Sequence, residues 1–169
     1  MTITPKIIIT DTNIITDLDN AKLLEKFVGL DNVYINDMVK NDEINFKTGN
    51  VDIINKMKEI PLTVEQLQEV NKLTLEEKGL SLYDLINYVV AHENNCILAT
   101  GDNRLKKYSE EHGVEVIRTL KIIELMENKK IISEKEAITA CINLRDNKYT
   151  RIPEININEL INKLQTVTS

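Results

Sequence analysis

Three acidic residues each stand where a short apolar run ends or a helical stretch begins. Asp11 follows the apolar residues 7–10, Asp102 follows residues 97–101, and Asp84 lies near the start of a helical stretch. Side chains that leave neighbouring parallel strands at their carboxyl ends converge on one crevice, where open α/β sheets bind ligands. Clustered carboxylates repel one another, so such a group usually binds a hard divalent cation. The three acids therefore predict metal-dependent chemistry on a phosphate group.

Each of these acids also has a purely structural explanation. Asp11 and Asp102 are residues that favour the N-cap of a helix, and Asp84 has capping-box spacing from Ser81. The helix of Asp84, however, is apolar around nearly its whole circumference, and a buried carboxylate without a charged partner is costly. Three acids on elements that are expected to be adjacent favour a functional site more strongly than any one of them does alone.

A fourth acid is expected from the acidic segment at residues 37–46. On an α-helix Val39 and Glu43 share a face at i and i+4, so burial of Val39 would turn Glu43 inward. Asp42 lies about 100° away and pairs in the same manner with Met38. Periodicity alone therefore leaves the choice between Asp42 and Glu43 open.

Short β-branched runs alternate with helical patterns along the chain. Strands are expected at residues 6–10, 33–35, 96–100 and 114–117, and helices at 20–30, about 37–46, 51–58, 63–78, 81–93, 105–111, 119–128, 133–144 and 157–164. This alternation predicts a central parallel sheet covered on both faces, which is a three-layer α/β/α fold. We expect a single domain over residues 1–169, with a core of about residues 1–130 and a C-terminal helical extension at 131–169.

The charge of the chain is unevenly distributed. The net charge is −6, which argues against a general nucleic-acid coating protein. Residues 1–99 hold 9 Lys and Arg against 16 Asp and Glu, whereas residues 100–169 hold 12 against 11. An acidic total remains compatible with an enzyme that acts on nucleic acid, provided that basic residues surround the site locally.

Membrane and secretory signals are not evident in the sequence. No apolar stretch approaches the roughly 20 residues that span a bilayer, and residues 1–6 lack the pattern of a secretory signal. Cys96 and Cys141 are far apart and have apolar neighbours, so we expect free buried thiols in a reducing compartment. These features predict a cytoplasmic protein with no membrane partner.

Four short segments, taken in order, resemble the PIN-domain family (the PilT N-terminus fold), which includes the VapC-type toxins of toxin–antitoxin systems. The matching segments are residues 9–13, 39–44, 80–84 and 98–105, and Leu120–Ile131 and Arg151–Pro153 resemble a bacterial subgroup. The resemblance covers nearly the whole chain. Its fold expectation agrees with the three-layer sheet that the alternation predicts.

Residue by residue, the resemblance implies a site. Four residues match the family's acidic quartet of catalytic and metal-binding side chains: Asp11, Glu43, Asp84 and Asp102. The match selects Glu43 over Asp42, and Asn13 and Thr100 match polar positions that support the carboxylates. Many members carry a further acid a few residues after the last motif, where this chain has Arg104. One tightly held ion, with another arriving alongside the substrate, would suit this departure.

The resemblance also implies an activity. A member of this family would be a Mg²⁺- or Mn²⁺-dependent endoribonuclease that hydrolyses single-stranded RNA, here the toxin of a toxin–antitoxin pair. Both ions are hard and prefer oxygen ligands, which the quartet supplies. The expected partners are RNA, an antitoxin protein and a second copy of the chain. Arg104, Lys106 and Lys107 directly follow the acidic crevice and are expected to bind RNA, with Lys121, Lys148 and Arg151 adding to the rim.

Two other classes of protein fit some of the same residues. A non-catalytic PIN-like binding module would keep the acids and act through a protein partner that places a basic side chain in the crevice. A phosphotransfer receiver or a HAD-type phosphatase also places Asp after an apolar strand, but Asn13 stands where the phosphatase needs a second Asp. His92 and His112 form no recognisable triad and are expected at the surface.

Overall fold

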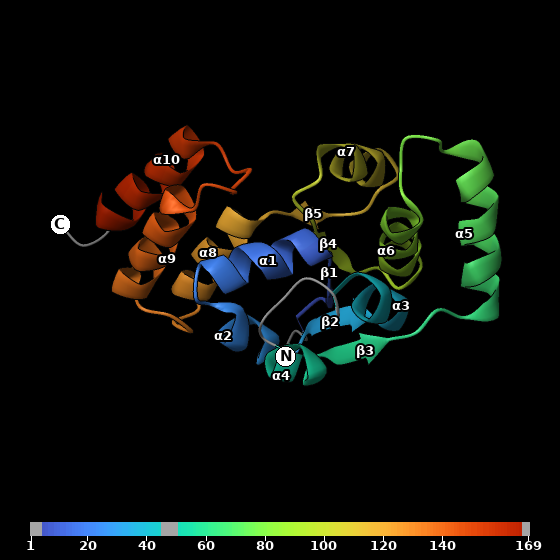
Figure 1. Ribbon diagram of the computed structural model, residues 1–169, viewed down its shortest axis with the longest axis horizontal. Helices are drawn as coiled ribbons and strands as arrows, with labels where there is room; N and C mark the ends of the chain where they lie inside the picture. Colours follow the sequence, from blue (N-terminus) through green and yellow to red (C-terminus); the bar gives the residue numbers. More distant parts are fainter. Residues whose placement is uncertain (1–4, 45–50, 167–169) are drawn as a thin grey trace.

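The computed structural model of the chain describes residues 5–44 and 51–166 (Figure 1). Five parallel strands form one sheet in the order β3-β2-β1-β4-β5. The strands are β1 (Ile8–Thr10), β2 (Val33–Asn36), β3 (Lys58–Ile60), β4 (Ile97–Ala99) and β5 (Val116–Ile117). Helices flank the sheet, so the prediction of a three-layer α/β/α fold with a parallel sheet is confirmed.

The helices fill the connections between the strands. They are α1 (Thr12–Asn20), α2 (Leu24–Val28), α3 (Asp37–Val39), the π-helix η1 (Lys40–Ile44), α4 (Val51–Asn55), α5 (Val64–Glu76), α6 (Leu82–Glu93), α7 (Asn103–Glu111), α8 (Thr119–Asn128), α9 (Glu134–Asp146) and α10 (Glu154–Thr166). Helix α6 packs against β1, β2 and β4, and α2 packs against β2. The centre of the sheet is therefore covered by the helix that carries Asp84.

The prediction of a continuous helix at residues 20–30 is wrong. Helix α1 begins directly after Asp11 and ends at Asn20, and a tight turn separates it from α2. Lys22 has a φ of +64°, and the amide of Leu23 donates to the carbonyl of Leu18 over 2.9 Å. This left-handed turn closes the last turn of α1 and redirects the chain, as in a Schellman motif. Asp11 thereby becomes the residue that joins β1 to α1.

The prediction of a helix at residues 51–58 is wrong about where the helix ends. Helix α4 stops at Asn55, and Lys58–Ile60 form strand β3 at the edge of the sheet, parallel to β2. An edge strand with a polar outward side chain such as Glu59 lacks the apolar run by which buried strands are recognised. The expected helix at about 37–46 becomes α3 followed by η1, and residues 45–46 lie outside the described part of the chain.

The core consists mainly of Ile, Leu and Val side chains that lie between the sheet and the helices. Ile9 of β1, Leu98 of β4 and Ile86 of α6 are fully buried. Cys96 and Cys141 are also buried and free, as expected. Within the described residues, no helix combines the length and the apolar character that crossing a membrane requires.

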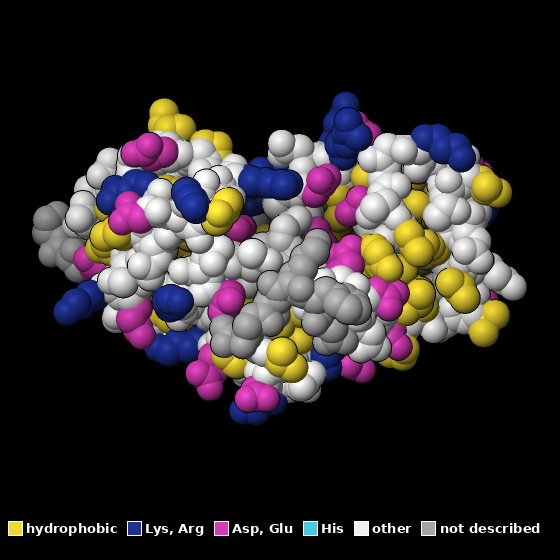
Figure 2. All heavy atoms as spheres, in the orientation of Figure 1, with side chains coloured by type: hydrophobic (Ala, Val, Ile, Leu, Met, Phe, Trp, Pro, Cys, Tyr) yellow, Lys and Arg dark blue, Asp and Glu magenta, His cyan; other side chains and the backbone are white. Residues whose placement is uncertain are grey.

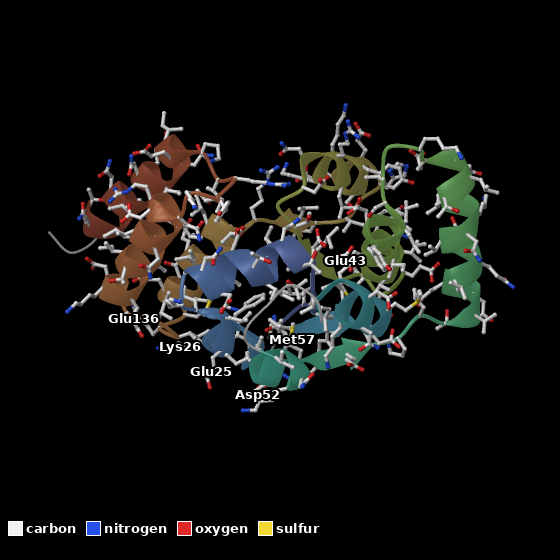
Figure 3. The ribbon with its side chains drawn as sticks, in the orientation of Figure 1. Glu25, Lys26, Glu43, Asp52, Met57 and Glu136 are labelled. Carbon is white, nitrogen blue, oxygen red and sulfur yellow. The ribbon has the colours of Figure 1, made fainter. Side chains whose placement is uncertain are left out.

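The C-terminal helices α9 and α10 pack against each other and against α8. Glu136 of α9 also accepts a hydrogen bond of 2.6 Å from Lys26 of α2 (Figure 3). Lys163 of α10 forms a similar contact of 2.6 Å with Glu124 of α8. The division into a core of about 130 residues and an extension at 131–169 stays a prediction.

Candidate functional site

The strand order fixes where side chains from different parts of the chain meet. The chain runs from β1 through β2 to β3 on one side, and then returns to place β4 beside β1 on the other. Ligands of open α/β sheets bind outside the carboxyl ends of the strands at such a change of direction. Asp11 follows β1 and Thr100 follows β4 at this edge, and the Asp11 amide donates to the Ala99 carbonyl over 2.9 Å.

Asp11 is buried, with 4% of its surface exposed, and four groups donate to its carboxylate. Oδ1 accepts from the Thr12 amide at 2.8 Å and from Asn87 Nδ2 at 3.3 Å. Oδ2 accepts from Thr100 Oγ1 at 2.8 Å and from Asn13 Nδ2 at 3.0 Å. The carboxylate is therefore held in one orientation by side chains from α1, α6 and the end of β4.

Burial raises the pKa of Asp11 from its usual value of 3.8 to about 6. The hydrogen bonds from Thr100 and from the Thr12 amide oppose this shift, whereas the negative charges of Asp84 and Glu43 add to it. Three carboxylates from different elements are thus close enough for their charges to interact. A positive ion placed among them would reverse this effect, because it stabilises the ionised form.

The structure distinguishes Glu43 from Asp42. Glu43 Oε2 accepts a hydrogen bond of 2.7 Å from Thr12 Oγ1, so this side chain lies at the start of α1 (Figure 3), and its charge acts on Asp11. Asp42 is exposed and accepts instead from the Tyr83 hydroxyl at 3.1 Å. Because η1 is a π-helix, the i and i+4 argument does not apply to it. The two acids nevertheless lie on different sides, and Glu43 is the one on the side of Asp11.

Asp84 and Asp102 both act as helix caps. Asp84 Oδ2 accepts from the Ser81 amide at 2.8 Å, and Ser81 Oγ accepts from the Asp84 amide at 3.1 Å, which completes a capping box. Asp102 Oδ1 accepts from the Leu105 amide at 2.8 Å at the start of α7. The structural explanations of these acids are therefore correct. Each of these bonds uses only one oxygen of its carboxylate, so the caps do not preclude a second role.

Asn13 and Thr100 connect the loop after β4 to the Asp11 carboxylate. Asn13 Oδ1 accepts from the Gly101 amide at 2.8 Å, while its amide nitrogen donates to Asp11. Thr100 Oγ1 donates to Asp11 and accepts from the Asp102 amide at 3.1 Å. The two polar residues therefore set the position of Asp102 relative to Asp11.

Sequence reasoning missed two polar residues at this site, Asn87 and Thr12. Asn87 is fully buried on α6, and its Nδ2 donates to Asp11 while its Oδ1 has no hydrogen-bond partner among the described residues. It lies three residues after Asp84 and so on the same face of the helix. An amide within an otherwise apolar helix face is the signal that points to it.

The donor set agrees in kind with a hard divalent cation, since it consists of carboxylate, amide and hydroxyl oxygens. Across residues 5–44 and 51–166, however, no three His, Cys, Asp or Glu side chains gather closely enough to hold a metal ion. Burial is the main cause of the raised Asp11 pKa, and the negative charges of Asp84 and Glu43 add to it, which favours a cation here. The residues therefore have the ligand atoms that such an ion prefers. Asp84 and Asp102, however, each cap a separate helix, and the acids are not gathered around one point.

A family model described as the PIN domain matches residues 7–166. The chain belongs to the PIN-domain family. PIN domains are generally nucleases, and they typically use divalent metals. None of the curated proteins matches the chain.

The basic side chains that follow Asp102 in this PIN domain differ in their partners. Lys106 and Lys107 face acids one turn along α7, with Nζ–Oε distances of 2.8 Å to Glu110 and 3.9 Å to Glu111. Arg104 is exposed at the start of the same helix. Figure 2 shows Lys and Arg side chains beside Asp and Glu side chains near the middle of the displayed face. The predicted RNA contacts thus lie on a surface of mixed charge.

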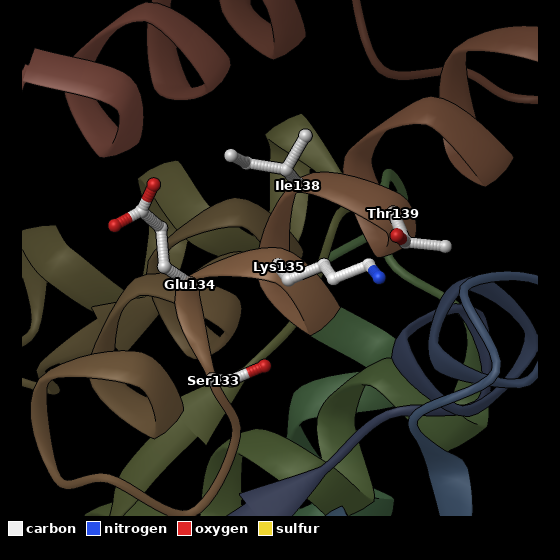
Figure 4. Close-up of a pocket in the computed structure, with 5 residues that line it drawn as sticks. All are labelled: Ser133, Glu134, Lys135, Ile138 and Thr139. Atoms are coloured by element: carbon white, nitrogen blue, oxygen red, sulfur yellow. The ribbon is translucent and has the colours of Figure 1, made fainter. Parts of the chain in front are cut away.

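Two other features of the PIN domain lie apart from the carboxylates. His92 and His112 are exposed, as expected, and pack with the rings of Tyr88 and Tyr108. A hollow of about 480 Å³ opens at the start of α9 (Figure 4). Its lining consists of Ser133, Glu134, Lys135, Ile138 and Thr139. It contains none of the predicted site residues, so its size does not make it the functional site.

Proposed function

We propose that this PIN domain is a metal-dependent ribonuclease that hydrolyses phosphodiester bonds of single-stranded RNA. The observation that carries the proposal is the buried Asp11 carboxylate, whose pKa is raised to about 6 by burial and by the charges of Asp84 and Glu43. A fold retains such a costly group where a bound cation or a reaction requires it. The membership of a family of nucleases agrees with this proposal.

Four carboxylates would hold Mg²⁺ or Mn²⁺ in this proposal: Asp11, Glu43, Asp84 and Asp102. A bound divalent ion supplies an activated water and stabilises the charge that develops on the leaving oxygen. The chain itself contributes orientation. Thr100, Asn13 and Asn87 donate to Asp11 and so fix the orientation of its carboxylate, while the Thr12 hydroxyl donates to Glu43.

The proposed substrate is unpaired RNA, and the proposed partners are proteins. An unpaired strand can bend its backbone into the edge of the sheet, whereas a duplex is stiffer. Arg104, Lys106 and Lys107 would bind the strand after it leaves the carboxylates.

We further propose that the protein is the toxin of a toxin–antitoxin pair and acts in the cytoplasm, and that it forms a homodimer. A partner peptide with a basic side chain would inhibit it by entering the acidic crevice.

The test is cleavage of a mixed single-stranded RNA pool by the purified protein. We expect cleavage with Mn²⁺ and a loss of at least about a hundredfold with EDTA or with Asp84→Asn, because either change removes part of the metal site. Product formation is read on denaturing gels. Cleavage that survives both EDTA and the substitution would mean a contaminant or a site elsewhere in the chain.

The capping box allows the structural role of Asp84 to be separated from its proposed catalytic role. Ser81→Ala on α6 and Ser133→Ala on α9 remove the same kind of cap. Each is expected to lower the free energy of unfolding by about 1 kcal/mol. Cleavage is expected to fall severalfold only in Ser81→Ala, because this cap positions Asp84. Urea unfolding and initial cleavage rates measure both effects, and equal rates in the two variants would contradict the proposed role.

The second candidate function is a non-catalytic binding module, and an exposed apolar surface favours it. Val64, Leu67 and Leu75 of α5 and Leu82 of α6 are exposed large apolar side chains. Figure 2 shows apolar side chains gathered over these two helices at the right of the molecule. Apolar surface of this kind marks interaction sites. A folded, metal-loaded protein that cleaves none of the RNA pool would favour this function or a narrowly selective toxin.

A further inference from the structure

Arg118 is the first residue beyond β5, on the side of the sheet where the carboxyl ends of the strands and the acids lie. The carbonyl of Ile117, directly before it, accepts from the Thr100 amide at 3.1 Å. Thr100 is also the residue whose hydroxyl donates to Asp11. Thr100 therefore links the residue before Arg118 to the Asp11 carboxylate through two hydrogen bonds. Arg118 belongs neither to the acidic quartet nor to the basic residues of α7.

The guanidinium of Arg118 is directed towards the loop that carries Asp102. Its Nη2 donates to Oδ1 of Asn103, the residue after Asp102. Its Nε is buried and has no hydrogen-bond partner among the described residues. A guanidinium has five N–H donors in a fixed fork, so the contact with Asn103 orients the group and leaves further donors for a ligand.

Three other cations in this part of the molecule have acidic partners. Lys106 and Lys107 face Glu110 and Glu111. Arg151 lies close enough to Asp17 to lower the pKa of that carboxyl against the effect of burial. Arg118, by contrast, forms no ion pair with a carboxylate in the part of the chain that the structure describes. Like the exposed Arg104 of α7, it is a cation in this part of the molecule whose charge is available for a bound anion.

We propose that Arg118 binds a phosphate of the nucleic acid strand next to the phosphodiester at the acidic site. The inference rests on the proposed function and makes it more specific. A guanidinium matches a phosphate in shape and charge, and charge-assisted hydrogen bonds of this kind are among the stronger ones. A cation on the β5 side of the carboxylates gives the strand a second anchor and so a fixed register, which makes Arg118 a substrate-binding residue.

The experiment compares the full chain with Arg118→Gln, Arg118→Lys and the control Lys129→Gln, at the opposite end of α8. Binding of a fluorescent single-stranded RNA decamer is measured by anisotropy in EDTA at several salt concentrations. We expect Arg118→Gln to raise Kd about tenfold, and to reduce the slope of log Kd against log salt by about 0.7, the value for one phosphate contact on a single strand. Arg118→Lys should restore most of the slope, and Lys129→Gln should leave it unchanged.

Unchanged Kd and slope in a folded Arg118→Gln protein would overturn the inference, as would equal losses in Arg118→Gln and Arg118→Lys. Failure of the wild-type protein to bind the decamer would overturn it as well. Failure of the proposed function is distinguishable from these results. RNA binding that depends on Arg118, without any cleavage in Mn²⁺, would remove the nuclease proposal and leave the phosphate contact standing.

Discussion

Replacing Asp11 with Asn is expected to reduce RNA cleavage in Mn²⁺ by about a thousandfold, which corresponds to about 4 kcal/mol of transition-state stabilisation. The substitution removes the charge that a divalent ion would bind. It also places an amide where four donors now point at a carboxylate. Initial rates with a fluorescent single-stranded RNA, at saturating Mn²⁺, measure the loss.

The adjacent acids of η1 provide the matched control for this prediction. Glu43→Gln removes the carboxylate that Thr12 holds beside Asp11, and it is expected to lower the rate in the same direction. Asp42→Asn removes an equal charge one residue away, on a side chain that contacts Tyr83, and should leave the rate within about twofold. Asp11→Asn activity within tenfold of wild type would place the reaction elsewhere. Equal losses in the two η1 variants would indicate a general effect of charge.

The overall architecture was predictable because alternating β-branched runs and helical patterns leave few topologies. The errors fall where one residue overrides a periodic pattern. Lys22 adopts a left-handed conformation without being Gly or Asn, so the break between α1 and α2 carries no usual sequence signal. Strand β3 was missed because an edge strand needs no continuous apolar run, and Lys58 and Glu59 give it a polar sequence.

At the candidate site, the sequence indicated the acids but not the geometry between them. Asp11 and Asp102 were recognisable because a strand end followed by Asp is a local pattern. The choice between Asp42 and Glu43 depended on a π-helix, which periodicity does not indicate. Asn87 was missed for a different reason, although an amide on an apolar helix face is a signal. Its role depends on the contact between α6 and β1, which lies far from it in sequence, since Asn87 and Asp11 are 76 residues apart.

In EDTA, the stability of this protein is expected to fall as the pH rises from about 4 to about 7. Asp11 has a pKa of about 6 in the folded chain against 3.8 as its usual value. Between these values the folded state holds a proton that the unfolded state has released, so the free energy of unfolding decreases as pH rises through this window. The shift of about two units corresponds to a loss of about 3 kcal/mol, which is complete above the folded pKa. Burial raises the pKa of Asp17 as well, which adds to the loss.

Urea unfolding of the wild type and of Asp11→Asn, followed by circular dichroism at pH 4, 5, 6 and 7, isolates this effect. All other titratable groups are common to both proteins, so the difference between the two curves reports Asp11 together with its interaction with Asp84 and Glu43. We expect that difference to shift by about 2 kcal/mol in favour of the variant between pH 4 and 7, because part of the full effect is already present at pH 4. Parallel curves would contradict the assignment.

Mn²⁺ connects this stability effect to the proposed function. An ion that binds the ionised site of the folded chain stabilises it according to the ratio of ion concentration to Kd. The wild type should therefore regain stability in Mn²⁺ at pH 7 and gain less at pH 5, where a proton competes for Asp11. Asp11→Asn should gain little at either pH. Asp11 would then both weaken the ion-free fold at neutral pH and bind the ion. This double role accounts for a buried acid at the carboxyl end of the central strand β1.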